Sequence, residues 1–323
     1  DGNNVEQIYQ ALQEAQEEKE KPFLIIGETV MGKGAVDENN ACFENKLSTH
    51  GQPVSKAGAS AEKTIAHLGG NPQAPFSFLE GVKAYWTKVN NRKRQQVSQL
   101  REQENEWRAA NPALAQKWDR FFNLDISHLN FEAVTLKAND STRGASGKVL
   151  QYLAQNVENM LVASADLANS DKTNGFLNET HALKKGDFSG AFLHAGVSEL
   201  TMGAIANGVA LHGGLRVACG TFFVFSDYMK PAVRLAALME LPVTYIWTHD
   251  SFRVGEDGPT HQPIEQEAQI RLLERLHNHS GKQSLVALRP ADGEETRVAW
   301  EFALKNTAVP TALILTRQNV NDL

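Results

Sequence analysis

The chain has little of what marks secreted, membrane-spanning or nucleic-acid-binding proteins. Only two of its 323 residues are cysteine, too few for a disulfide framework or a cysteine-rich zinc site. No apolar run approaches the roughly 18 residues of a membrane helix, and the net charge of -6 disfavours a nucleic-acid scaffold. These absences predict a cytoplasmic protein with a small-molecule partner, and neither a membrane nor a nucleic-acid partner.

The phosphate-binding motifs of common nucleotide enzymes are also missing. Neither the GxGxxG sequence of dinucleotide-binding domains nor the Walker A sequence occurs, so nicotinamide and nucleotide-triphosphate chemistry lose their main support. The chain begins at Asp1 without an initiator methionine and without the charged and apolar regions of a signal peptide. We therefore expect a fragment of a longer protein.

Three regions differ in their residue patterns. Residues 1–36 hold a helix-like stretch (Val5 to Glu18) and a strand-like stretch (Pro22 to Thr29), which together predict one αβ unit of a larger domain. Residues 37–139 are predicted to be a linker with surface helices, because a long charged helical stretch (Phe78 to Phe122) dominates them.

Residues 140–323 alternate between helix-like and strand-like stretches. The strand-like stretches are continuously apolar, which is typical of a parallel sheet covered on both faces. We therefore predict an α/β domain with a doubly wound parallel sheet. The expected strands are Leu161 to Ala165, Val217 to Val224, Val243 to Trp247, Leu285 to Leu288 and Ala312 to Leu315. The expected helices are Gly147 to Glu158, Glu199 to Leu211, Tyr228 to Met239, Ile264 to Leu276 and Glu294 to Lys305.

The segment from His249 to Pro263 is the most informative part of the chain. It places two histidines and three acidic residues in a turn-rich loop that leaves the carboxyl end of an expected strand. Open α/β sheets bind their ligands at that end of their strands. The segment therefore predicts an active-site loop.

The same loop resembles the signature of the transketolases, thiamine-diphosphate enzymes that move a two-carbon ketol unit between sugar phosphates. The run Gly255-Glu256-Asp257-Gly258-Pro259-Thr260-His261-Gln262-Pro263 is highly specific to that family. Further segments agree with the family in order: Ser48-Thr49-His50-Gly51, Arg143-Gly144-Ala145-Ser146, Ser164-Ala165-Asp166-Leu167, Gly196-Val197-Ser198-Glu199, Thr221-Phe222-Phe223-Val224-Phe225 and Leu315-Thr316-Arg317-Gln318-Asn319. The resemblance implies that residues 1–36 end a diphosphate-binding domain and that residues 140–323 form the pyrimidine-binding domain.

The resemblance assigns cofactor contacts to five residues. Glu199 would hydrogen-bond a ring nitrogen of the aminopyrimidine, so that the cofactor's own amino group can take the proton from the thiazolium carbon. Phe222, Phe225 and Tyr228 would hold the pyrimidine ring. Asp166 would approach the cofactor across the interface of a homodimer. Without the resemblance, Glu199 would be a favourable charge at a helix start, Asp166 a helix cap and the aromatic residues a core face.

Sugar phosphate contacts follow from the same resemblance. The phosphate end is assigned to Arg143, Ser170, His249 and Arg317, and the reacting end to His50, Asp257 and His261. Arginine suits a phosphate because its planar donors engage two oxygens at once. His50 and His261 are assigned catalytic proton transfer together with Glu199, since an imidazole titrates near neutral pH.

Two departures from the family limit what the fragment is expected to do alone. The family's Gly-Asp-Gly and asparagine motif is absent, so ligands for the Mg²⁺ or Ca²⁺ ion of the intact enzyme are not expected here. The chain also ends at Leu323, where transketolases carry a third domain. We expect an inactive half-site from an enzyme of the pentose phosphate pathway. The alternatives are a non-catalytic dimerisation module, or a related ketol transferase or synthase such as dihydroxyacetone synthase or a deoxyxylulose-phosphate synthase-like protein.

Overall fold

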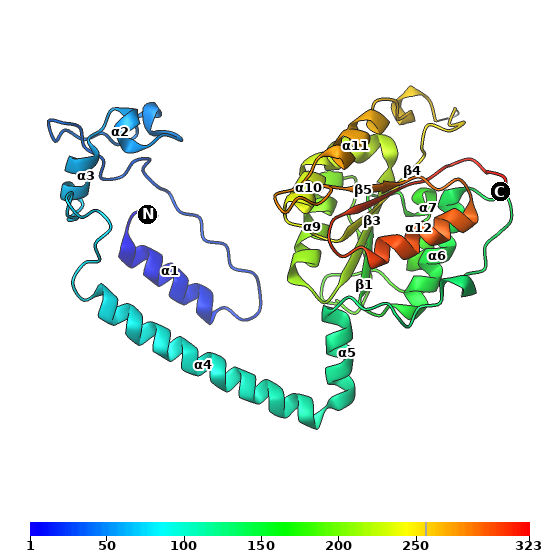
Figure 1. Cartoon of the computed structure of the whole chain (residues 1–323), viewed down its shortest axis with the longest axis horizontal. Helices are drawn as coiled ribbons and strands as arrows, with labels where there is room; N and C mark the ends of the chain where they lie inside the picture. The colour runs from blue at the N-terminus through cyan, green and yellow to red at the C-terminus, as the bar shows by residue number, and fades with distance from the viewer. Residues whose placement is uncertain (256) are drawn as a thin grey trace. The chain divides into compact units, whose positions relative to one another are not determined.

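The computed structural model describes residues 1–255 and 257–323, and these form two compact units, Asp1–Glu106 and Trp107–Leu323 (Figure 1). Glu256, one of the three acids of the expected active-site loop, lies outside the described residues. Among the described helices, none combines the length and apolarity that crossing a membrane requires.

The first unit is mainly helical and contains the first expected helix. This helix, α1 (Val5–Glu17), begins at Asn4, whose side chain accepts hydrogen bonds from the backbone N–H groups of Glu6 and Gln7. The other helical elements are η1 (Leu47–Thr49), α2 (Val54–Ala57), α3 (Ala61–His67) and α4 (Val82–Ala110), which runs on into the second unit.

The strand expected at Pro22 to Thr29 is not formed, and that prediction is wrong. A strand is stabilised by backbone hydrogen bonds to a neighbouring strand, and no described segment of this unit pairs with residues 22–29 in that way. The side chains of Leu24 and Ile26 are 82% and 84% exposed. The apolar pattern therefore describes a segment that could lie in a sheet but has no partner strand within the unit.

The second unit is built, across the described residues, on a six-stranded sheet in which all neighbours pair in parallel. Its strands are β1 (Met160–Ser164), β2 (Phe192–His194), β3 (Arg216–Phe222), β4 (Val243–Thr248), β5 (Val286–Leu288) and β6 (Thr311–Ile314). They stand in the order β2-β1-β3-β4-β6-β5, so the chain reaches β2 on one side of β1 and β3 on the other. The expected doubly wound parallel sheet is confirmed, and a change of direction of this kind is where such sheets bind ligands.

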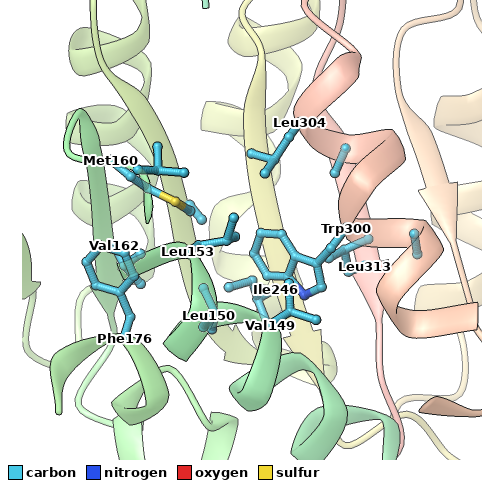
Figure 2. Close-up of a cluster of buried hydrophobic side chains, with 14 of the residues drawn as sticks. Val149, Leu150, Leu153, Met160, Val162, Phe176, Ile246, Trp300, Leu304 and Leu313 are labelled. Carbon is cyan, nitrogen blue, oxygen red and sulfur yellow. The ribbon is translucent and has the colours of Figure 1, made fainter. Parts of the chain in front are cut away.

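Helices cover both faces of this sheet (Figure 1). They are α6 (Thr142–Asn156), α7 (Ala168–Asp171), α8 (Asn174–Leu177), α9 (Glu199–His212), α10 (Ser226–Leu238), α11 (Gln266–Arg275) and α12 (Gly293–Lys305), and α5 (Pro112–Phe122) precedes them. One buried cluster joins α6, α8 and α12 to the sheet, with Trp300 among its largest side chains (Figure 2). A second cluster joins α9, α10 and α11 to the sheet through side chains that include Met202 and Met229. Because each face has its own apolar layer, the strands are apolar throughout.

The structure shifts the bounds of the expected elements and adds a strand. Helix α6 begins at Thr142, five residues before the expected start, because Ser141 caps it by accepting a hydrogen bond from the Gly144 backbone N–H. Strand β2 was not expected, since it has only three residues, and among the described strands its one neighbour is β1. The long charged stretch forms two helices that break at Asn111 and Pro112, where proline begins α5.

Candidate functional site

The expected site residues of the second unit gather at one edge of the sheet. Asp166 follows β1, Phe222 ends β3, His249 follows β4 and Arg317 follows β6. The pairing of Ser164 with Gly220, of Phe222 with Thr248 and of Trp247 with Ile314 places these strand ends side by side. His50 belongs to the first unit, where it follows the short helix η1 and is exposed.

Arg143, His249, Asp257 and Arg317 form a charged cluster, called here the cationic cluster. Arg143 Nη1 lies 3.3 Å from His249 Nε2. Asp257 Oδ2 lies 3.8 Å from His249 Nε2 and 3.2 Å from Arg317 Nε, an ion pair without the angles of a hydrogen bond. The sheet therefore brings together residues that are up to 174 positions apart in the sequence.

Arg143 is held by the loop that follows β1. This loop, residues 165–172, includes the one-turn helix α7. Its Nη1 donates to the Ser170 backbone oxygen at 2.7 Å, while its Nε is buried and has no hydrogen-bond partner among the described residues. Burial lowers the pKa of the Arg143 guanidinium, the nearby Arg317 lowers it further, and Asp257 opposes both. A buried N–H without a partner costs free energy, which an anion bound here would recover.

His249 is fixed in its backbone and on both sides of its ring. The residue is 2% exposed and has a φ of 60°, a left-handed conformation that is uncommon outside glycine. Its Nδ1 lies 2.9 Å from the Thr248 hydroxyl, and its ring stacks on Phe222 with centroids 3.7 Å apart. These contacts leave Nε2 toward Arg143 and Asp257.

Three aromatic rings continue from this cluster in a row. They belong to Phe222, Phe225 and Tyr228 and are called the aromatic path. Phe222 and Phe225 stack with centroids 5.8 Å apart, and Phe225 and Tyr228 stack at 6.0 Å. His261 meets the edges of Phe222 and Phe225 at 5.7 and 5.4 Å, and its Nδ1 lies 2.9 Å from the Thr260 hydroxyl. The aromatic residues come from a strand end, a 3-10 turn and the start of α10, so they are not one face of a single helix.

Glu199 opens α9 beside the start of α10. It is 7% exposed, and no hydrogen bond to its carboxyl group is found among the described residues. Gly203, one turn later, brings the helices together, because an added Cβ there would meet Ala232 Cβ at 2.9 Å. A buried carboxyl group can accept a hydrogen bond from a ring nitrogen, and stacked aromatic rings such as those of Phe222, Phe225 and Tyr228 fit the face of a flat heterocycle such as the thiamine pyrimidine.

Two buried carboxyl groups near the site were given no role by the sequence analysis, although one of them, Asp250, belongs to the expected active-site loop. Asp250, directly after His249, receives hydrogen bonds from Nε and Nη2 of Arg289 at 3.0 and 2.8 Å. Burial raises the pKa of Asp250, and Arg289 opposes that rise. The other is Asp171, which follows Ser170 and is fully buried. Their positions next to expected site residues are the one sequence signal that could have indicated them.

The described residues do not supply a metal centre. No group of three or more histidine, cysteine, aspartate or glutamate side chains that could hold a metal ion is found among residues 1–255 and 257–323.

Known protein families and individual relatives match this chain along nearly its whole length. Residues 139–322 match the family described as "Transketolase, pyrimidine binding domain", and residues 1–126 match "Transketolase, thiamine diphosphate binding domain". A transketolase of Halalkalibacterium halodurans is 39% identical over 100% of this chain, and one of Bacillus subtilis is 38% identical over 99%. Each match covers 46% of the relative, so the chain spans about half the length of these proteins.

Solved structures give the same result for the fold. A transketolase from Leishmania mexicana superposes with a TM-score of 0.84 at 30% identity, covering 99% of this chain and 45% of that one. A Pichia stipitis transketolase in complex with sedoheptulose-7-phosphate superposes with a TM-score of 0.83 at 32% identity, covering 99% and 46%. The parallel sheet, the motif-bearing loop at its carboxyl edge and the two matched domains together show that the chain belongs to the transketolase family.

Proposed function

We propose that the chain carries the pyrimidine-binding side of a thiamine-diphosphate site and the phosphate-binding end of a sugar phosphate site. The activity is that of a transketolase, which transfers a two-carbon ketol unit from a ketose phosphate to an aldose phosphate in the pentose phosphate pathway. The observation that carries the proposal is the cationic cluster next to the path of aromatic rings. The sugar phosphate bound in the Pichia stipitis structure supports the substrate class.

The cationic cluster binds the phosphate of the sugar. Arg143 and Arg317 supply the positive charges, and His249 adds a hydrogen bond from Nε2. Ser170 lies against Arg143, so its hydroxyl adds one more donor at the same place. Asp257 takes part in the ion pair with Arg317 while no phosphate is present, and the anion competes with it for the guanidinium.

The reacting end of the sugar lies along the aromatic path. His261 moves protons to and from sugar oxygens, because an imidazole ring has one nitrogen that can donate a proton and one that can accept one. Asp257, two residues before the 3-10 turn η4 (Pro259–His261), accepts a hydrogen bond from a sugar hydroxyl once the phosphate engages Arg317. For His50, which belongs to the first unit, a role in proton transfer rests on the family resemblance alone.

The cofactor is bound by its pyrimidine ring. Phe222, Phe225 and Tyr228 form its aromatic wall, and Glu199 holds a ring nitrogen with its buried carboxyl group. When bound, thiamine diphosphate would supply a carbon nucleophile for the ketose carbonyl. The Glu199 carboxyl group would hold a proton at the pyrimidine ring nitrogen, and this hydrogen bond would favour the tautomer of the cofactor that can accept the proton of the thiazolium carbon.

Several features of the whole enzyme remain proposals of the same kind. The division into the end of the diphosphate-binding domain (1–36), a linker (37–139) and the pyrimidine-binding domain (140–323) is one of them. The family match of the diphosphate-binding domain extends over most of this linker, to residue 126. The enzyme is a cytoplasmic homodimer in which Asp166 reaches the cofactor of the partner subunit. A Mg²⁺ or Ca²⁺ ion is held elsewhere in that enzyme.

Replacing Arg317 tests the phosphate site. In the full-length enzyme, Arg317→Ala removes a charge-assisted contact, so the KM for xylulose 5-phosphate is expected to rise about 10- to 100-fold. The KM for unphosphorylated hydroxypyruvate should change less than about twofold, because it makes no phosphate contact. Arg297→Ala, which removes a surface ion pair of α12, is the control. Equal changes with both donors would show that Arg317 has only a structural role.

A further inference from the structure

Asp171 is a buried carboxyl group with a complete set of partners. It is 0% exposed, and it stands directly after Ser170, whose carbonyl oxygen accepts the Arg143 guanidinium. The Ser164 hydroxyl donates to Oδ2 at 2.7 Å. The backbone N–H and hydroxyl of Thr173 donate to Oδ1 at 2.9 and 2.7 Å. The carboxyl group therefore joins the last residue of β1 to the residue that follows the loop.

The loop closed in this way has a backbone that needs support. Asp166 and Lys172 have φ angles of 62° and 65°, in the left-handed region that non-glycine residues adopt at a cost in free energy. The Leu167 backbone N–H donates to the Ser164 hydroxyl at 3.2 Å, so Ser164 contacts both the start of the loop and Asp171. The loop conformation, and with it the Ser170 carbonyl, depends on this small network.

The sheet leaves room for the Asp171 carboxyl group. Gly220 of β3 faces it, and an added Cβ at Gly220 would lie 2.8 Å from Asp171 Oδ2 and 2.7 Å from Thr173 Cγ2. Both distances are shorter than ordinary van der Waals contact. Glycine in the interior of a strand marks such a close approach.

Charge also links Asp171 to the cationic cluster. Burial raises the pKa of Asp171 to about 6, while the hydrogen bonds from Ser164 and Thr173 and the positive charge of Arg143 oppose that rise. The Asp171 charge in turn raises the pKa of Arg143. Cys219, the other titratable neighbour, has its thiol pKa raised by burial and by Asp171.

We propose that Asp171 is a positioning residue that orients Arg143 for the substrate phosphate, by fixing the loop whose Ser170 carbonyl accepts the guanidinium. This inference rests on the proposed role of Arg143 in phosphate binding. Asp171 itself is buried and does not touch the substrate.

The test compares three variants of this chain with the unchanged chain. Asp171→Ala removes the network, and Asp171→Asn keeps one oxygen for Thr173 and gains an amide that can donate to Ser164. Asp187→Ala is the control, because Asp187 accepts the same kind of hydrogen bonds from Ser189 in an exposed turn. The readouts are the NMR signal of the Arg143 Nε–H, assigned with Arg143→Lys, and the Kd for inorganic phosphate measured by calorimetry.

Asp171→Ala is expected to broaden or shift the Arg143 signal and to weaken phosphate binding about tenfold, the effect of one misdirected charge-assisted hydrogen bond. Asp171→Asn should keep the signal and stay within about threefold of the original Kd, and Asp187→Ala should change neither. An unchanged Arg143 signal and Kd in folded Asp171→Ala would overturn the proposal.

The outcomes separate this proposal from the proposed function. If the unchanged chain binds no phosphate but Asp171→Ala still alters the Arg143 signal, positioning stands and the phosphate role of Arg143 fails. If Asp171→Ala does not fold, Ser164→Ala decides the question. It removes the hydroxyl that donates to Oδ2 and accepts from the Leu167 N–H, but it keeps the carboxyl group and both of its hydrogen bonds from Thr173. An unaltered Arg143 signal in that variant would then count against the proposal.

Discussion

At the scale of single residues, the buried charge of Asp171 lowers the stability of the fold, while its hydrogen bonds fix the position of the loop after β1. A carboxylate that is 0% exposed loses its hydration, and three hydrogen bonds and the charge of Arg143 offset only part of that loss. Its pKa of about 6 in the fold therefore lies above the ordinary value of 3.8. Groups whose pKa is raised in this way are concentrated at functional sites, where the position of a side chain matters more than its contribution to stability.

The raised pKa of Asp171 predicts a pH-dependent difference in stability between the unchanged chain and Asp171→Asn. A raised value means that the fold binds more protons than the unfolded chain between about pH 4 and 6. The protonated carboxyl group stabilises the fold fully when the pH is below the pKa of Asp171 in the unfolded chain. This stabilisation is lost as the pH rises through the pKa of Asp171 in the fold. Only the unchanged chain loses this stabilisation. As the pH rises from 4 to 7, the free energy of unfolding of Asp171→Asn should therefore increase by on the order of 3 kcal/mol relative to that of the unchanged chain. Urea unfolding of both chains at several pH values measures this, and a difference that does not vary with pH would contradict it.

At the scale of elements, Arg216 joins β3 by hydrogen bonds to α12 and to the turn after α5. It is 7% exposed at the start of β3, and it donates to the Leu304 carbonyl oxygen in the last turn of α12 and to the Leu124 carbonyl oxygen after α5. Burial lowers the pKa of its guanidinium to about 10, with the charge of Asp125 opposing. A cation near the carboxyl end of a helix is favourable because the helix dipole is negative there. The Arg216 guanidinium also donates to the Leu304 carbonyl oxygen, which has no donor within the helix.

Replacing Arg216 by methionine should destabilise the second unit. The change keeps an apolar stem but leaves the Leu304 and Leu124 carbonyl oxygens without this donor, which is expected to cost about 1 to 3 kcal/mol. Lys305→Met is a matched control in the same turn of α12, since it removes only an exposed pair with Glu301 and should cost less than about 1 kcal/mol. The free energies of urea unfolding, followed by tryptophan fluorescence, compare the two. Similar values for both variants would refute a role for Arg216 in joining the elements.

Elements with continuous apolar sequences were predictable, and those that depend on distant partners were not. Val243 to Trp247 formed β4 because its side chains are buried on both faces of the sheet. Pro22 to Thr29 has a similar pattern but no strand to pair with, so the same rule failed there. The short β2 has too few residues for a recognisable pattern.

The place of the site followed from the sequence, but its contacts did not. A loop rich in polar residues after a buried strand predicts the carboxyl edge of the sheet, where His249 and Arg317 are found. The roles of these residues came from a resemblance to a family, and they remain predictions. The contact between Arg143 and His249 joins positions 106 residues apart, and the network around Asp171 depends on a left-handed turn, so neither follows from spacing along the chain.

At the scale of the whole molecule, the second unit combines two parts of one proposed site. The aromatic path and Glu199 form the cofactor side, and the cationic cluster forms the phosphate end. His261 touches the aromatic path, and Asp257 of the same loop touches the cationic cluster. One loop thus contacts both parts, while the chain spans about half the length of the transketolases it matches.

The exchange of deuterium at the thiazolium carbon of bound thiamine diphosphate tests the central claim most directly. In the full-length enzyme, Glu199→Gln should slow this exchange about 100-fold or more while the fold is kept, because the ring nitrogen loses its carboxyl partner. Glu294→Gln, an exposed glutamate in the first turn of α12, should leave the rate unchanged. Undiminished exchange in Glu199→Gln would contradict the assignment of this unit as the pyrimidine-binding side of the site.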